Sequence, residues 1–78
     1  MEDKIDYKEN KIPNYYIGDV YGYECRNIIE DYDLGYNIGS AVAYLLRAER
    51  KHDSSYECIQ KAINHLEFEL DKINNIEQ

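Results

Sequence analysis

The residues best suited to chemistry form a cationic cluster in the middle of the sequence. Arg47, Arg50 and Lys51 lie within five consecutive positions of a 78-residue chain that has nine basic residues and a net charge of -7. At helical spacing Arg47 and Lys51 share a face with Tyr44. A guanidinium can grip a phosphate with two hydrogen bonds, an ammonium adds a point charge, and a phenol ring can stack a base. The cluster is therefore a candidate anion site for a small nucleotide, although composition alone favours the ordinary explanation that basic residues in a last helical turn offset the helix dipole.

Other catalytic chemistry has little support in the pattern. The sequence contains no GxxxxGK[ST] phosphate loop, and neither cysteine has a histidine beside it. Ser40, Ser54 and Ser55 lie where helix packing or helix capping explains them. We therefore expect no catalytic residue, and the basic cluster is interpreted as a binding site.

Metal binding is also weakly indicated. The carboxylates between positions 67 and 71 are spaced by two residues, which spreads them around a helix. Those between 30 and 33 gather near an expected helix end, where a cation could offset the unfavourable dipole, although a solvated acidic rim is the simpler interpretation. Cys25 and Cys58 do not complete a zinc spacing with the two histidines. We expect no metal and no cofactor, and we expect both cysteines to be reduced, buried thiols.

Three helices are expected to position the cationic cluster, at about 22–33, 37–51 and 54–75. Apolar residues at i, i+3, i+4 and i+7 define the first helix, and Gly35 is expected to end it with a positive φ. Asn37 is the expected cap of the second helix. The apolar face of the second helix comprises Ile38, Ala41, Val42 and Leu45. The fold class is therefore predicted as all-α.

The last helix has the clearest signals. Ser54 and Glu57 have the reciprocal spacing of a capping box. An apolar seam then steps by four, three, four and three residues, as in a heptad. Its members are Ile59, Ile63, Leu66, Leu70 and Ile73. Because this seam outlasts its neighbours in the chain, we expect its far end to pack on a partner subunit.

The rest of the chain predicts one domain at 13–78 behind a charged, flexible arm at 1–12. The aromatic-rich stretch after Pro13 is expected to be irregular and anchored by Tyr15 and Tyr16. A chain this short buries a modest fraction of its surface, so we expect a homo-oligomer. The acidic balance argues against nucleic acid and anionic membranes as partners. No leader or membrane-span pattern is evident, so we expect a cytoplasmic protein, in the cytoplasm of a host cell.

Three stretches of the sequence resemble a bacteriophage family. They read "NYY", "GYECRNIIEDYDLGYNIGSAVAYLLRAERK" and "ECIQKAINHLEFEL", and together they span roughly residues 13 to 71. In order and spacing they are similar to a small helical domain of unknown function that is often described as nucleotide-kinase-like. The positions that match are Tyr16, Asn37, Gly39, Tyr44, Arg47, Arg50, Lys51, Glu57 and Lys61.

The resemblance implies that the protein handles nucleotides. The leading hypothesis is a phage protein that sequesters a small phosphorylated ligand in pockets between subunits, as a sponge for a nucleotide signal of host immunity. Its predicted ligand-binding residues are Tyr16, Asn37, Tyr44, Arg47, Arg50, Lys51, Lys61 and His65.

Two alternatives stay open. The first is a deoxynucleoside monophosphate kinase-like enzyme without a Walker loop. Departures from the family pattern at Ala43, Glu49, Cys58 and His65 remove a lysine and a carboxylate, which weakens phosphoryl transfer more than binding. The second is an acidic inhibitor of a host nuclease, although the carboxylates are scattered along the chain instead of forming a row.

Overall fold

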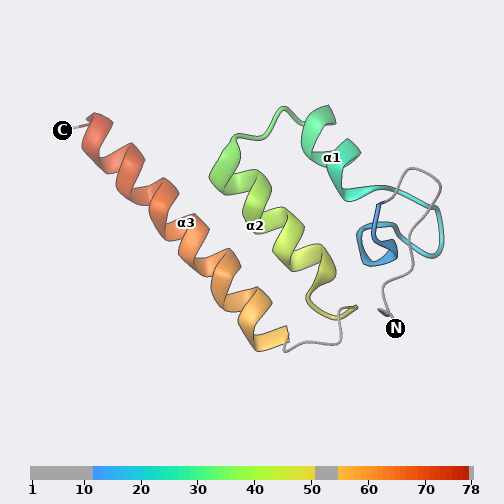
Figure 1. Ribbon diagram of the computed structural model, residues 1–78. Coiled ribbons are helices and arrows are strands. Elements are labelled where there is room, and N and C mark those ends of the chain that lie inside the picture. Colours follow the sequence, from blue (N-terminus) through green and yellow to red (C-terminus); the bar gives the residue numbers. More distant parts are fainter. Residues whose placement is uncertain (1–11, 51–54, 78) are drawn as a thin grey trace.

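The computed structural model describes residues 12–50 and 55–77 (Figure 1). Within these ranges the chain forms a 3₁₀ turn and three α-helices, and no strand. The elements are η1 (Asn14–Tyr16), α1 (Cys25–Asp31), α2 (Tyr36–Arg47) and α3 (Ser55–Glu77). The all-α prediction is confirmed.

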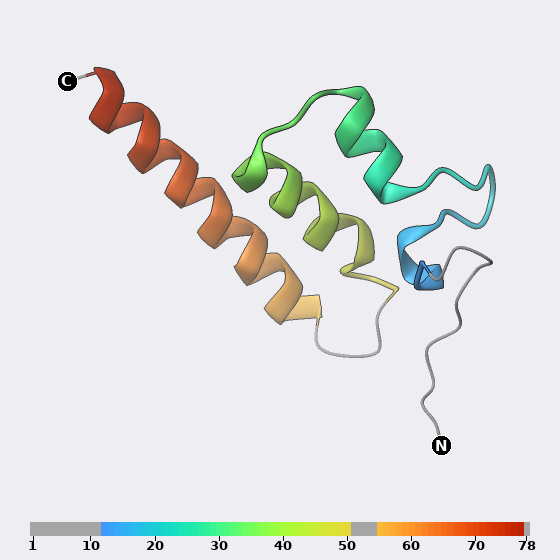
Figure 2. The ribbon, with the colours of Figure 1, turned by 45° about the horizontal axis from the view of Figure 1, so that its top comes forward.

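The three helices lie in a single layer with α2 in the middle. In both views α2 lies between α1 and α3, and α3 runs antiparallel to α2 and extends well past it (Figures 1 and 2). Contacts join α2 to α3, α1 and η1. The longest dimension of the molecule is 50 Å. One helix therefore holds the others together, and the described helices form no second layer.

Small side chains fill the seams between the helices. The buried apolar residues are Cys25, Ala41, Ala48, Cys58 and Ala62, and no large side chain in the described ranges is fully buried. A carbon added at Gly39 of α2 would lie 3.1 Å from Cγ2 of Ile29, so α1 and α2 also approach closely. Both cysteines are free and buried, as the sequence predicts.

The first helix is shorter than expected at its start. It begins at Cys25 instead of about residue 22 because the residues before it have other conformations. Gly22 has a φ of +75°, and Glu24 is extended and forms an antiparallel bridge with Ile17. These conformations are incompatible with a helical turn.

The end of α1 corrects the prediction for Gly35. The left-handed residue is Asp33, with a φ of 53°, while Gly35 has a φ of -72° and precedes α2 as its N-cap. The amide of Asp33 donates to the carbonyl of Glu30 at 3.1 Å, and that of Leu34 donates to Ile29 at 3.0 Å. This pair of bonds is the Schellman motif, with an aspartate where glycine is usual.

The bounds of the other two helices also differ from those expected. Asn37 is not the cap of α2 but its second residue, because α2 starts at Tyr36 after an extended Gly35. At its far end α2 stops at Arg47. The residues that follow form tighter hydrogen bonds between positions three apart, such as the bond of 3.0 Å from the amide of Arg50 to the carbonyl of Arg47. The last helix is described from residue 55 to residue 77, two residues beyond the expected end. Ser54 lies outside the described residues, so its capping box stays a prediction.

The apolar seam of α3 is half exposed. Ile59, Ile63, Leu66, Leu70 and Ile73, named here the α3 seam, expose between 39% and 58% of their surface. On α2, Ala41 is buried but Leu45 is 50% exposed. In the described part of the chain no helix is both long enough and apolar enough to cross a membrane.

Candidate functional site

Six of the eight predicted ligand-binding residues form a continuous series of contacts along α2 and α3. We call them the aromatic-cationic strip. Its members are Tyr16, Asn37, Tyr44, Arg47, Lys61 and His65. The residues of the strip come from both long helices and from the η1 turn, because α3 runs antiparallel to α2 and η1 packs at the end of α2.

Arg47 is the centre of this strip at the end of α2. Its Nη1 donates a hydrogen bond of 2.7 Å to the hydroxyl of Tyr16. Its guanidinium carbon lies 4.8 Å from the ring centroid of Tyr44 and 5.7 Å from that of Tyr15. Burial alone would lower the pKa of Arg47, but interactions with the Cys58 and Tyr16 side chains raise it above its ordinary value. The guanidinium therefore stays charged, and its buried Nε has no hydrogen-bond partner among the described residues.

Tyr44 joins the two helices through its ring. Besides Arg47, the ammonium of Lys61 lies over this ring at 5.6 Å from the centroid. The ring of His65 stacks on it at 5.9 Å with an angle of 22° between the planes. Cations are attracted to the negative face of an aromatic ring at these distances. One phenol ring thus contacts an arginine from its own helix and a lysine from the next helix.

His65 is fixed by a hydrogen-bond relay. Asn37 donates from Nδ2 to a carboxylate oxygen of Glu69 at 3.3 Å. Its amide oxygen is then the acceptor for Nδ1 of His65, 3.0 Å away. The rings of Tyr36 and Phe68 meet His65 edge-on, with centroids at 5.4 and 6.0 Å. His65 is therefore a hydrogen-bonded packing residue, and its Nε2 is the nitrogen left for a further partner.

Arg50, another predicted ligand-binding residue, does not belong to the strip. Arg50 donates from Nη2 to the carbonyl of Asn14 and to a carboxylate oxygen of Asp19, both at 3.1 Å. It therefore fastens the segment after Pro13 to the end of α2 and is not placed beside Tyr44. Lys51 lies outside the described residues.

The charges of the described cations divide into two groups. Arg26, Arg50 and Lys72 each pair with a carboxylate, at 3.0, 3.1 and 3.7 Å. Within residues 12–50 and 55–77, no carboxylate lies within ion-pair distance of Arg47 or Lys61. These two are also the cations that lie against Tyr44. Among the described residues of this acidic chain, the strip is therefore the place where positive charge is least neutralised.

Sequence reasoning missed several neighbours of the strip. Cys58, Glu69 and the rings of Tyr36 and Phe68 contact it directly. On α3, positions 58, 65 and 69 share one face because they are spaced by seven and four residues. Sequence reasoning missed this spacing because the α3 seam on the adjacent face is more apolar and dominates the pattern. The carboxylates considered for a metal do not gather, since no three His, Cys, Asp or Glu of the described ranges lie close enough to hold an ion.

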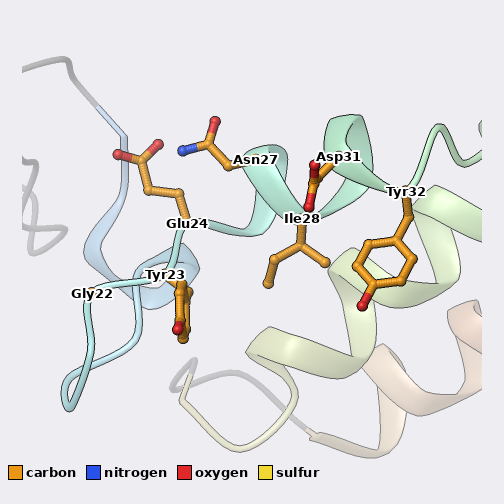
Figure 3. Close-up of a pocket in the computed structure, with 7 residues that line it drawn as sticks. All are labelled: Gly22, Tyr23, Glu24, Asn27, Ile28, Asp31 and Tyr32. Carbon is orange, nitrogen blue, oxygen red and sulfur yellow. The ribbon is translucent and has the colours of Figure 1, made fainter.

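A separate shallow hollow of about 660 Å³ lies along α1 (Figure 3). Its lining consists of Gly22, Tyr23, Glu24, Asn27, Ile28, Asp31 and Tyr32. Figure 3 shows Tyr23, Ile28 and Tyr32 pointing to one side of α1 while Glu24 and Asn27 point away. The hollow contains two carboxylates and no cation, and none of the predicted ligand-binding residues lines it. Its charge disfavours a phosphate.

Comparison with known proteins gives no relative of this chain. No protein-family model matches it, and no curated protein or solved structure does so either. The likeness to the phage family therefore depends on the three sequence stretches alone.

Proposed function

We propose that this protein is a non-catalytic binding protein for a small phosphorylated ligand, a nucleotide, held on the aromatic-cationic strip. Arg47 and Lys61 hold the phosphate beside the ring of Tyr44. The observation that carries the proposal is that these two cations share one ring and lack a carboxylate partner among the described residues. A phosphate would supply the missing negative charge.

The surrounding residues have positioning roles in this proposal. Tyr16 fixes one arm of the Arg47 guanidinium through its hydroxyl. Asn37 fixes the ring of His65, so that Nε2 can contact a sugar or phosphate oxygen. Groups held in place before the ligand arrives lose less entropy on binding.

The biological setting that we propose comes from the resemblance. A phage protein of this kind would act in the host cytoplasm as a sponge that removes a nucleotide signal of host immunity. Binding without turnover is sufficient for that role.

Isothermal titration against mononucleotides, cyclic dinucleotides and ADP-ribose derivatives tests the proposal. We expect one class to bind, and we expect Lys61→Gln to weaken that class about tenfold through loss of a charged contact. Arg26→Gln is the control, because Arg26 is exposed and pairs with Glu24, away from the strip. Binding no tighter than about 1 mM to every compound, or equal losses in the two variants, would contradict the proposal.

The same ligands also separate binding from turnover. The protein is incubated with ATP, magnesium and each deoxynucleoside monophosphate, and the mixture is analysed by chromatography. Unchanged nucleotides support a binding protein. Formation of a nucleoside diphosphate would contradict a binding role without turnover and would support the kinase-like alternative.

A further inference from the structure

The α3 seam is a long apolar stripe that the described part of the chain leaves half exposed. Its five isoleucine and leucine side chains are each 39% to 58% exposed. They extend over roughly 21 Å of the helix at 1.5 Å per residue. Next to it on α2, Leu45 is 50% exposed. Monomeric proteins rarely leave a continuous apolar stripe of this kind in water.

The architecture explains why the seam is uncovered. Domains usually bury the apolar faces of their elements between two packed layers. Here the described helices form one layer, and α3 contacts α2 through its neighbouring face at Cys58, Ala62 and His65. The buried residues of that contact are small and contribute little apolar area. The second layer has to come from elsewhere.

We infer that a second copy of this chain covers the α3 seam, with the two α3 helices packed antiparallel. Residues 1–11 are too poor in apolar side chains to do so, since Met1, Ile5 and Tyr7 are their large apolar residues. A second copy supplies an identical seam of five apolar side chains. The inference does not depend on the proposed ligand.

Charge selects the antiparallel orientation. Residues 55–66 of α3 carry one carboxylate and one ammonium, Glu57 and Lys61. Residues 67–76 carry three carboxylates and one ammonium, Glu67, Glu69, Asp71 and Lys72. A parallel pair would place the two acidic halves together, whereas an antiparallel pair places each beside the neutral half of the other chain. The helix dipoles are also opposed in the antiparallel pair.

We place the twofold axis of the dimer at Leu66, the middle residue of the seam. Ile59 and Ile73 each lie seven residues from Leu66, so this register aligns the two ends of the seams. In an antiparallel pair with a twofold axis, Leu66 of one chain therefore meets Leu66 of the other, and Ile59 lies opposite Ile73.

The strip stays open in this arrangement. His65 stacks on Tyr44, and Leu66, the next residue, points about 100° away around the helix. The dimer therefore covers the seam without covering the predicted ligand site, so failure of ligand binding and failure of dimerisation are separate results.

Cysteine cross-linking of the full chain tests the interface and its orientation together. We expect Leu66→Cys to form a covalent dimer under mild oxidation. Ile59→Cys alone should not, because its partner position is 73, and Ile59→Cys mixed with Ile73→Cys should. Asn75→Cys, on the opposite face of α3, and the wild-type chain with its buried Cys25 and Cys58 are the controls. Failure of Leu66→Cys to cross-link, or self-linking of Ile59→Cys, would overturn the antiparallel dimer.

The wild-type protein gives an independent measurement that requires no variant. Light scattering should give twice the chain mass of 9.3 kDa. The melting temperature should rise by roughly 3 to 6 °C for each tenfold increase in protein concentration, because dilution favours the separated, unfolded chains. A single-chain mass at about 0.1 mM together with a concentration-independent melting temperature would refute the inference.

Discussion

At the scale of single residues, Arg47 serves two purposes. It holds the η1 turn to the end of α2 through Tyr16, and it presents positive charge beside Tyr44. A buried Nε without a partner among the described residues is costly unless something compensates it. The structural role and the proposed binding role are therefore not separable at this residue, and Lys61 is the better residue for testing the ligand site.

Two weak acids, the Cys25 thiol and the Tyr16 phenol, make stability sensitive to alkaline pH. Burial raises the pKa of the Cys25 thiol above its ordinary 9.0. Burial also raises the pKa of Tyr16 above 10.0, although Arg47 opposes the shift. The folded state then holds these protons more tightly than the unfolded state. Its stability is complete below the unfolded pKa values and is lost as pH rises through the folded values.

Urea unfolding at a series of pH values should show this loss. We expect the free energy of unfolding to be flat below about pH 8 and to decline from about pH 9 upward. Cys25→Ala should flatten the early part of the decline, and Tyr16→Phe should flatten the part above pH 10. A profile that is unchanged in both variants would show that burial does not shift these groups.

At the scale of elements, the end of α1 carries avoidable strain. Asp33 occupies a φ of 53°, where glycine is favoured, and it places a negative charge at the negative end of the helix. We expect Asp33→Gly to raise the free energy of unfolding by roughly 0.5 to 1 kcal/mol. Thermal unfolding of the variant and the wild type measures the difference.

Asp33→Asn separates the two causes. Asparagine tolerates the left-handed conformation and removes the charge, so it should recover only the electrostatic part of the gain. Loss of stability in Asp33→Gly would mean that the aspartate side chain makes a compensating contact.

At the scale of the whole molecule, salt should act in opposite directions on stability and on ligand binding. A net charge of -7 repels itself within one chain and between two. Raising sodium chloride from about 20 to about 500 mM screens this repulsion and should raise the melting temperature. The same screening weakens the attraction of Arg47 and Lys61 for phosphate, so nucleotide affinity should fall. Melting curves and titrations in the two buffers measure both, and changes in the same direction would contradict this account.

The sequence is sufficient to predict the helices because their apolar periodicity is local. It does not predict which face of α3 meets α2. The seam from Ile59 onward has the strongest periodic signal, yet the contact uses Cys58 and Ala62 beside it, where small side chains let the backbones approach. Periodicity analysis gives most weight to large apolar side chains, whereas the close contact between α2 and α3 is made by small ones.

The candidate site was predictable in part for the same reason. Tyr44 and Arg47 are close in sequence on one helix, and their contact follows from helical spacing. The pairing of Arg50 with Asp19 crosses 31 residues and depends on how the η1 segment folds back. The αL position of Asp33 also escaped prediction because Gly35, two residues later, is the better candidate by residue type.

Among the described residues, α3 continues beyond Glu69, which reaches Asn37 near the start of α2. Helical turns without packing are marginal in water, because keeping a helix depends on tertiary support. If a second copy covers the α3 seam as inferred above, these last turns would be more ordered in concentrated than in dilute solution. The helicity of the last residues would then report how much of the protein is associated.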